Sequence, residues 1–298
     1  MRTTFRLLLI AVPWLLVILG STEAQQPAAP PPAQTQPTTS RPGTFSERSL
    51  ALVLKTKDAA RGVGDYSAVF NKREYYRGKE FSAESIALSY SARLGKLAGK
   101  SSGWSGKQFV FDLKKGTLRA KLAVMPFALE LDPFDSRALA NNHHSVHKLG
   151  LQQFADTFHR FFTPAYEART GDMGEPEEVV KYGRKLWRIK LVYATSGKGR
   201  RYTLQKGDTY LELEQKLGTS INVLLNVNDG VDDYADLTPG TTVFVPEGYG
   251  SWLYVFLDQE HGWLVGQEIY DHQGRLFNNY HYEKVETGRT FSEKDFDL

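Results

Sequence analysis

Three histidines lie close together in the sequence, at His143, His144 and His147. On a helix, His143 and His147 would share one face, and two histidines at that spacing bind zinc when further ligands join them. No glutamate follows in the arrangement that a zinc protease uses for its general base. We therefore interpret the segment as the polar start of a helix and predict no metal site.

A phosphate-binding loop is suggested by Gly95, Gly99, Lys100 and Ser101. In such a loop, glycines let backbone amides surround a phosphate, and the lysine neutralises its charge. Here the first glycine is one residue too close to the second, and no buried strand precedes it. The pattern therefore does not predict a phosphate site.

Carboxylates, which glycoside hydrolysis needs in pairs, are offered by Glu175, Glu177 and Glu178. These residues flank Pro176, and no separate second acid accompanies them, so a solvated charge run is the better interpretation. The chain has no cysteine, and no serine stands in a nucleophile-elbow motif. We predict no catalytic residue, no cofactor and no enzymatic activity.

The first 24 residues have the three parts of a secretory signal peptide. Arg2 and Arg6 supply the positive charge, Leu7 to Gly20 the apolar core, and Thr22 to Ala24 a cleavage site. This apolar core is shorter than the roughly 20 residues that a membrane span needs. We expect export to the periplasm or cell envelope, cleavage near Ala24 and no stable membrane span afterwards. An uncleaved anchor is the alternative.

Residues 25–43 are rich in Pro, Ala, Gln and Thr and almost free of charge. Such a segment cannot bury enough apolar surface to fold, so we predict a disordered linker. The whole chain is 41% hydrophobic, which is ordinary for a globular protein. Its formal net charge of +3 is too small to favour nucleic acid as a partner.

Residues 202–246 are the most regular stretch of the chain. Short β-type runs form its two ends, and the two segments between them have apolar residues at helical spacing. Gly207 permits a turn before the first helix, which Asp208 or Thr209 would cap with a side-chain oxygen. The pattern predicts a strand, two helices and a second strand.

Specific residues at both ends of this stretch carry a resemblance to a known module. They are Tyr202, Thr203, Gly207, Asp208, Thr209, Leu224, Leu225, Asn228, Leu237, Pro239, Gly240 and Val243 to Pro246. The stretch resembles LysM, a small envelope domain that binds N-acetylglucosamine-containing glycans such as peptidoglycan and chitin. It departs from that family at Glu214, where a small residue is usual, and in a lengthened acidic loop, Asp229 to Asp236.

The resemblance implies a shallow glycan groove between two loops of the module, the first from Gly207 to Tyr210 and the second from Val231 to Leu237. Its binding residues would be Gly207, Asp208, Thr209, Tyr210, Val231, Asp232, Tyr234 and Leu237. Backbone groups would read the N-acetyl group, while Tyr210 or Tyr234 would stack on a sugar ring. A degenerate module, retained as a spacer or protein contact, is the alternative. Residues 202–248 carry a net charge of −6, so they are a poor partner for anionic polymers.

The segments around the module have the patterns of one α+β domain. A capping-box pattern at Thr44 to Glu47 begins a helix that ends at Gly62, and Val146 to Phe162 predicts a second helix that Pro164 closes. Alternating apolar residues predict antiparallel strands between the helices and on both sides of the module. We expect the module to be inserted between two neighbouring strands.

Short motifs in these flanks carry a second resemblance. They are Asp65 to Ala68, Lys72 to Glu74, Pro126 to Leu129, His144 to Gly150, Tyr280 to Tyr282, Phe291 and Asp295-Phe296. Together they resemble DUF1571, a family of exported bacterial proteins of unknown function that is abundant in planctomycetes. That family is similar to the lipoprotein carriers LolA and LolB, which implies a half-barrel: a curved antiparallel sheet closed by helices over an apolar cavity.

A half-barrel of this kind would place aromatic side chains around a pocket for an acyl chain. The candidates are Phe109, Phe111, Trp187, Trp252, Tyr254, Phe256 and Trp263. The alternative is an ordinary core, because a curved sheet covered by helices needs large side chains in either case.

These patterns divide the chain into five predicted segments: signal peptide 1–24, linker 25–43, host domain 44–200, LysM module 201–248 and the rest of the host, 249–298. The first hypothesis is a non-enzymatic exported envelope protein that binds peptidoglycan or a chitin-like glycan through the module. The second is a carrier or sensor of lipid or lipoprotein in the half-barrel, with the module as a localiser. The third is an envelope glycan hydrolase.

Overall fold

The computed structural model describes residues 44–298, except for residues 103–105, 123, 140–141, 194–197, 209, 218 and 232–236. The predicted signal peptide and linker lie outside the described residues. The described residues belong to one compact unit. In the described part of this unit, no helix is both long and apolar enough to cross a membrane.

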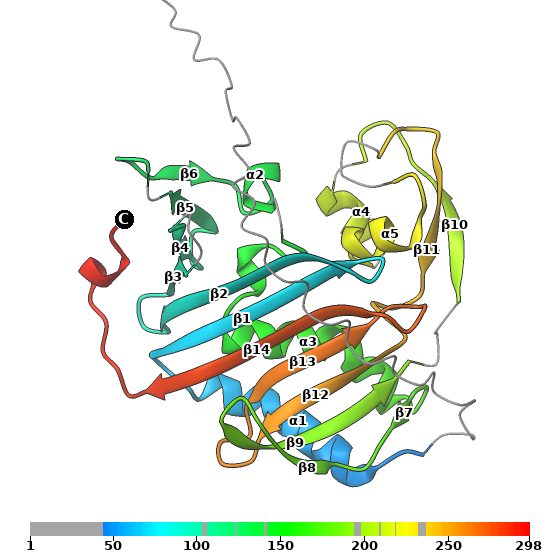
Figure 1. The fold of residues 1–298 in the computed structure, drawn as a ribbon, viewed down its shortest axis with the longest axis horizontal. Coiled ribbons are helices and arrows are strands. Elements are labelled where there is room, and N and C mark those ends of the chain that lie inside the picture. Colours follow the sequence, from blue (N-terminus) through cyan, green and yellow to red (C-terminus); the bar gives the residue numbers. More distant parts are fainter. Residues whose placement is uncertain are drawn as a thin grey trace, which may run out of the picture. The chain divides into compact units, whose positions relative to one another are not determined.

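One antiparallel sheet organises the host part of the chain (Figure 1). Its strands are β1 (Tyr66–Tyr76), β2 (Lys79–Ser91), β3 (Lys96–Ser101), β4 (Gln108–Asp112), β5 (Thr117–Lys121), β6 (Leu129–Leu131), β7 (Asp172–Met173), β8 (Glu177–Lys181), β9 (Arg184–Val192), β12 (Trp252–Asp258), β13 (Leu264–Tyr270) and β14 (Leu276–Thr287). They lie in the order β6-β5-β4-β3-β2-β1-β14-β13-β12-β9-β7, and β8 also pairs with β9. The predicted curved antiparallel sheet with packed helices is confirmed, and it ends at β6 and β7 without closing.

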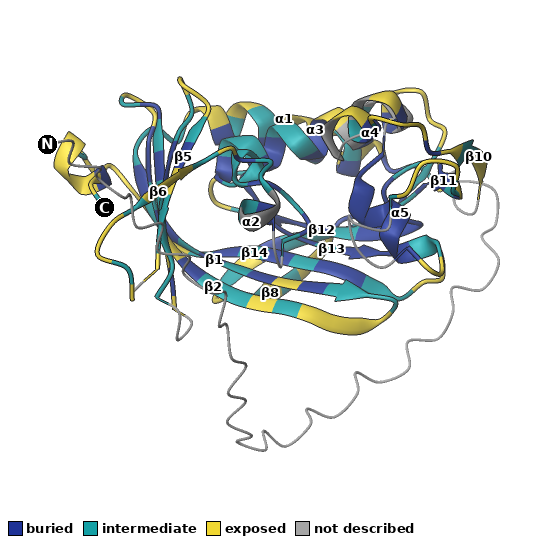
Figure 2. Cartoon of the chain, turned by 90° about the horizontal axis from the view of Figure 1, so that it is seen from above, coloured by how far each residue is buried: buried dark blue, intermediate teal, exposed yellow. Residues whose placement is uncertain are grey.

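Strands such as β1 alternate between a buried face and a less buried face, as a sheet covered on one side requires, whereas β12 and β13 are buried on both faces. On β1, Tyr66, Ala68 and Phe70 are buried, whereas Ser67 and Val69 are half-buried. The buried face is covered by α1 (Glu47–Arg61) and α3 (Leu151–Glu167), which lie along one side of the sheet (Figure 2). Shorter helical turns are α2 (Ser136–Leu139), η1 (Val146–Lys148) and η3 (Glu293–Phe296).

The N-cap of helix α1 lies two residues after Thr44, the first residue of the predicted capping box. Its N-cap is Ser46, whose hydroxyl accepts a hydrogen bond from the Ser49 backbone at 3.1 Å. Thr44 instead lies before the helix, where its carbonyl accepts from the backbone of Met173 next to a short bridge between the two segments. The predicted end of the helix at Gly62 is confirmed.

Helix α3 starts and ends differently from the prediction. Gly150, with φ of +108°, separates it from η1. Buried tyrosines then satisfy the first free amides, because the Tyr282 and Tyr66 hydroxyls accept from Gly150 and Leu151 at 3.0 and 2.7 Å. The helix continues through Pro164 to Glu167, so the predicted end at Pro164 is wrong. The last turn is anchored in the core by Tyr166, which is 1% exposed.

The module is inserted between β9 and β12, which are neighbours in the sheet, as predicted: Ile189 lies opposite Val255. It consists of β10 (Gly199–Thr203), α4 (Tyr210–Leu217), α5 (Ile221–Val227) and β11 (Thr242–Pro246). Strands β10 and β11 form their own antiparallel pair. The predicted order of strand, helix, helix and strand is confirmed.

Candidate functional site

The module has an apolar core of its own. Leu213 of α4 and Ile221 and Leu224 of α5 are at most 1% exposed and pack with Val243 and Val245 of β11. These residues are the apolar positions at helical spacing in α4 and α5 and at alternating spacing in β11, so the sequence pattern was sufficient to predict the elements. The core fixes both helices against the β10–β11 pair.

Asn228 joins the end of α5 to β11. Its amide nitrogen donates to the carbonyls of Leu224 and Phe244, each at 2.8 Å, and its amide oxygen accepts from the Phe244 backbone at 2.7 Å. The side chain therefore satisfies one of the carbonyls that a helix end leaves free and also completes the edge of a strand. This arrangement sets where the chain leaves α5.

Asp208 holds the first loop of the predicted groove together. Its carboxylate accepts from the Gln205 backbone at 2.7 Å and from the Tyr202 hydroxyl at 2.8 Å, and it lies 3.3 Å from the Lys216 ammonium. The hydrogen bond from Gln205, aided by Tyr202 and Lys216, lowers the pKa of this carboxyl against the opposing effect of burial. Asp208 thus shapes the loop from within. Gly207 beside it has φ of +92°, which favours glycine.

The segments that flank the two predicted loops are hydrogen-bonded to each other. The Leu204 amide donates to the Thr241 carbonyl at 2.8 Å, and the Gly240 amide donates to the Leu204 carbonyl at the same distance. Val231 is 3% exposed and Leu237 packs against the module core, so the Val231 side chain faces inward and only its backbone can face a groove. Tyr210 is the first residue of α4. The predicted groove residues Thr209, Asp232 and Tyr234 lie outside the described residues.

Exposed residues lie at the edges of both predicted loops. Gly207 in the first loop is exposed, as are Gln205 and Lys206 just before it and residues 238–240 just after the second loop. Some of their backbone groups are already used within the domain, because the Gln205 amide donates to Asp208 and the Gly240 amide donates to Leu204. The hydrogen bonds between Leu204 and residues 240–241 join segments that flank the two loops, and the glycan groove between the loops stays a prediction.

Helix α5 turns its other side to the host. Asn222, Val223 and Asn226, which we call the docking face of α5, are 1%, 2% and 3% exposed. Val223 belongs to the core of the host sheet, whereas Leu224 and Leu225 belong to the core of the module. The helix is therefore buried on both sides, which is how a helix that is apolar around most of its circumference must lie.

Hydrogen bonds from the host reach both asparagines of the docking face. The Tyr76 hydroxyl donates to Asn222 at 2.6 Å, and Asn222 donates to the carbonyl of His143. Asn226 accepts from the Arg77 backbone at 2.7 Å and donates to the Asp271 carboxylate at 3.1 Å. Each asparagine thus uses its donor and its acceptor, as buried amides must.

Helix α4 makes a further, charged contact with the host. Glu214 lies 3.7 Å from Lys148, and both side chains are largely buried, at 15% and 13% exposure. Burial lowers the pKa of the Lys148 ammonium, and the Glu214 charge opposes this shift. Glu214 is the position where the module departs from its family pattern, so the contact with the host gives that departure a structural reason.

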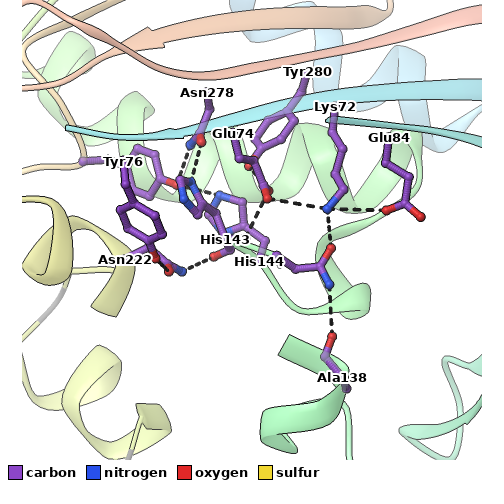
Figure 3. A network of polar contacts seen from close by, with 12 residues as sticks. Lys72, Glu74, Tyr76, Glu84, Ala138, His143, His144, Asn222, Asn278 and Tyr280 are labelled. Atoms are coloured by element: carbon purple, nitrogen blue, oxygen red, sulfur yellow. Dashed lines mark hydrogen bonds and ion pairs between the residues drawn. The ribbon is translucent and has the colours of Figure 1, made fainter. Parts of the chain in front are cut away.

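Behind the docking face lies a buried polar network of the host (Figure 3). Glu74 accepts from the Tyr280 hydroxyl at 2.6 Å and from the His143 backbone at 3.0 Å, and it lies 3.5 Å from the Lys72 ammonium. His143 is hydrogen-bonded through Nδ1 to Asn278 at 2.6 Å. The network fixes the segment that carries His143, whose carbonyl receives Asn222 of the module.

The histidines of this segment are structural in the described chain. They precede α3 as predicted, but His147 lies in a 3-10 turn and His143 and His144 lie before it. Burial lowers the pKa of all three imidazoles, to about 4 for His147. Within the described residues, no group of three or more His, Cys, Asp or Glu side chains is arranged to hold a metal ion.

Three of the predicted pocket residues lie on the helix-covered face of the sheet. Phe111 is buried in the main core, and Phe109 and Trp187 pack against it. The Phe109 ring crosses β3 at Gly99, where an added Cβ would come within 2.3 Å of the ring. Gly99, one of the glycines of the discarded phosphate-loop pattern, is therefore a packing position.

The other predicted pocket residues lie elsewhere. Trp252, Tyr254 and Phe256 alternate along β12 with residues such as Val255, which faces the main core. Cations of β9 lie over the Trp252 and Tyr254 rings, and Phe256 packs with Trp263 in a separate cluster. Because alternate strand residues point to opposite faces, the seven aromatic residues do not line one cavity. The prediction of a shared pocket is wrong.

The docking residues were missed in the sequence, although a signal was present. Asn222 and Asn226 have helical i, i+4 spacing inside an otherwise apolar helix. Asparagine is a poor helix former, and a solvated helix face usually carries charged residues instead. Two neutral amides on one face indicate hydrogen bonding to another part of the protein.

The comparison with protein families identifies the inserted segment. Residues 202–246 match the LysM domain family. The match begins inside β10 and ends with β11, so it covers the end of β10 and all of α4, α5 and β11; we call the β10-α4-α5-β11 unit the LysM domain. No curated protein matches the chain by sequence. The resemblance of the flanks to DUF1571 stays a prediction.

Solved structures resemble the chain over most of its length but at low identity. The Mycobacterium tuberculosis lipoprotein LppX is 10% identical, with a TM-score of 0.41, and the match covers 83% of this chain and 99% of LppX. A LolA superfamily protein from Nitrosomonas europaea is 7% identical, with a TM-score of 0.34 and coverage of 84% and 97%. The Pseudomonas aeruginosa MucA/MucB complex is 11% identical, with a TM-score of 0.41 and coverage of 84% and 61%. All three TM-scores are below 0.5, so these likenesses assign no function.

Proposed function

We propose that this chain is an exported, non-enzymatic protein of the cell envelope that binds peptidoglycan or another N-acetylglucosamine-containing glycan through its LysM domain. The observation that supports this proposal most directly is the match of residues 202–246 to that family. The arrangement of the domain agrees with it, because the host contacts described above fall on α4, α5 and the end of α5, whereas exposed residues lie at the edges of the two predicted loops.

The chemistry of the groove would be that of exposed backbone groups on two fixed loops. Asp208 holds the first loop by accepting hydrogen bonds, and Asn228 holds the start of the second. A loop that is already ordered loses less conformational entropy when a sugar binds. A single shallow site still buries little area, so we expect weak binding to short oligomers and stronger retention on a polymer that offers many sites.

Co-sedimentation with purified peptidoglycan and with chitin tests the proposal. We expect the mature chain to sediment with at least one polymer and the double variant Asp208→Ala, Tyr210→Ala to lose most of this retention while staying folded. Arg200→Ala is the matched control, since Arg200 is exposed on β10 of the same domain but precedes the loop. Equal retention of all three proteins would contradict a glycan site in these loops.

The same assay separates binding from hydrolysis. A glycan-binding protein leaves the amount of soluble reducing sugar unchanged over time, whereas a hydrolase raises it. Point variants are preferable here to removal of the domain, because α5 contributes Val223 to the host core and two amides to its hydrogen bonds. A chain without residues 201–248 would expose that core, and its retention would not report on the glycan alone.

A further inference from the structure

The tip of the β1–β2 hairpin reaches the end of α5. The Arg77 guanidinium donates from Nη2 to the carbonyl of Asn228 at 2.7 Å and to that of Leu225 at 3.3 Å. Its Nε lies 3.8 Å from the carboxylate of Asp229, the first residue after Asn228. Its backbone amide donates to Asn226. One host arginine thus contacts four residues between positions 225 and 229, where the chain leaves the helix.

These contacts are the ones that a helix C-terminus needs. The last carbonyls of a helix have no partner within it, and the helix dipole favours a positive charge there. A guanidinium presents several donors in a rigid plane, so it can hold two carbonyls at once. Helix α5 has only seven residues, and a helix of that length is marginal without external contacts. Asn228 satisfies the Leu224 carbonyl from within the domain, and Arg77 adds donors to the carbonyls of Leu225 and Asn228.

The backbone at Arg77 points to the same role. Arg77 and Gly78 have φ of +49° and +79°, which is the conformation of a two-residue turn between antiparallel strands. Asn or Asp is favoured at the first position of such a turn, because a longer side chain is strained with positive φ. An arginine here costs stability in the turn, and its contacts with α5 offset that cost.

We propose that Arg77 is a positioning residue for glycan binding: the host hairpin sets the direction in which the chain leaves α5 toward the second loop of the groove. Asn228 is held from inside the domain by Phe244 and from outside by Arg77, so both surfaces of this junction are fixed. The inference rests on the proposed function, and it means that a host residue helps to position the glycan-binding loop. The LysM domain of this chain would then bind more weakly without its host.

The test uses the full chain and the variant Arg77→Asn, which keeps a residue suited to the turn but removes the guanidinium. We expect calorimetric titration with an N-acetylglucosamine pentamer to give an affinity about five- to ten-fold lower for the variant, the size of a typical coupling between two sites. Arg73→Ala is the control, because Arg73 lies on β1, which leads into this turn, pairs with Glu80 on the surface and should leave affinity unchanged. Equal affinity of Arg77→Asn and the unmodified chain would overturn the inference but not the proposed function.

Amide hydrogen exchange without any sugar tests the positioning separately. In Arg77→Asn we expect faster exchange at residues 226–231 and unchanged exchange in β10 and β11. A general loss of stability would instead accelerate exchange throughout the LysM domain. If the unmodified chain binds no pentamer, the proposed function fails. Unchanged exchange at residues 226–231 would still overturn the role of Arg77.

Discussion

Two carboxylates in this protein each hold a loop in place, but in different surroundings. Glu74 is 2% exposed and accepts from Tyr280 and from the backbone of His143, with Lys72 beside it. Asp208 of the LysM domain accepts from Gln205 and Tyr202 and is itself 8% exposed, but the Lys216 beside it is 48% exposed, whereas Lys72 is 5% exposed. The donor types are the same: one backbone amide, one tyrosine hydroxyl and one lysine.

The difference between them lies in what surrounds the charges. Removing one partner of a buried pair leaves the other charge without water, which is costly, whereas water replaces the partner of a surface pair. The Glu74 cluster should therefore determine whether the host and its docked LysM domain stay folded. The Asp208 cluster should mainly determine the shape of one loop.

The largest effect is expected for Glu74→Gln. It leaves the Lys72 ammonium, 5% exposed, with Glu84 as the remaining carboxylate at 3.5 Å. Breaking a buried ion pair costs about 3–5 kcal/mol, and we expect the lower end, about 3 kcal/mol, because Glu84 still contributes. Urea unfolding of the full chain measures this loss.

The control for that variant is Glu80→Gln. Glu80 pairs with Arg73 at 3.7 Å, and both side chains are about half exposed or more. Exposed pairs contribute about 0–1 kcal/mol, so this variant should unfold close to the unmodified chain. If both variants lost the same stability, burial would not be the reason that the Glu74 pair is costly to break.

A smaller loss is expected for Asn222→Ala on the docking face. The Tyr76 hydroxyl and the His143 carbonyl would both lose a partner, and a buried polar group left unsatisfied costs about 1–3 kcal/mol. A double-mutant cycle with Tyr76→Phe should show strongly non-additive losses in urea unfolding, because both changes remove the same hydrogen bond. Simple additivity would mean that this bond does not hold the LysM domain on the host.

A still smaller, pH-dependent effect is expected from the buried histidines. Burial lowers the pKa of His144 in the folded chain, so the unfolded chain takes up the proton first as the pH falls below about 6.5. Stability should therefore decrease between pH 6.5 and 5.5, and His144→Gln should reduce that decrease by about 1 kcal/mol. The pKa values of Asp208 and Asp258 are lowered from their ordinary values, so these carboxylates do not titrate in this window. Stability that rises toward pH 5.5 would contradict the buried, neutral state of His144.

The smallest effect on stability is expected for Asp208→Asn. The Lys216 ammonium is 48% exposed, so water can solvate it once the carboxylate charge is removed, and the urea midpoint should change less than in the Glu74 and Asn222 variants. The loop would be less ordered, and we expect affinity for an N-acetylglucosamine pentamer to fall by about five-fold. Calorimetric titration checks this, and a large loss of stability without a loss of affinity would reverse the assignment of the two clusters.

The same contrast explains what the sequence could predict. The partners of Asp208 lie within eight residues of it, and the apolar positions of α4 and α5 follow helical spacing, so the LysM domain was readable from local patterns. The alternation along the host strands likewise predicted a sheet with one covered face. Contacts between residues that are close in the sequence can therefore be predicted from local patterns.

Contacts between distant residues were not readable in this way. Tyr280 is 206 positions from Glu74, and Asn222 is 146 positions from Tyr76. No periodicity connects such residues, and only the order of strands in the sheet brings them together. The inward direction of Val231 and the two faces of β12 also depend on packing and register, which a single sequence does not specify.

The central claim is that the LysM domain binds glycan at its exposed loops while α5 stays docked on the host. Amide hydrogen exchange of the full chain, with and without a saturating N-acetylglucosamine pentamer, tests it most directly. We predict slower exchange on binding at residues 205–208 and 237–241 and no change at residues 222–226, which the host already protects. Protection on the host sheet with none in the two loops would contradict the claim.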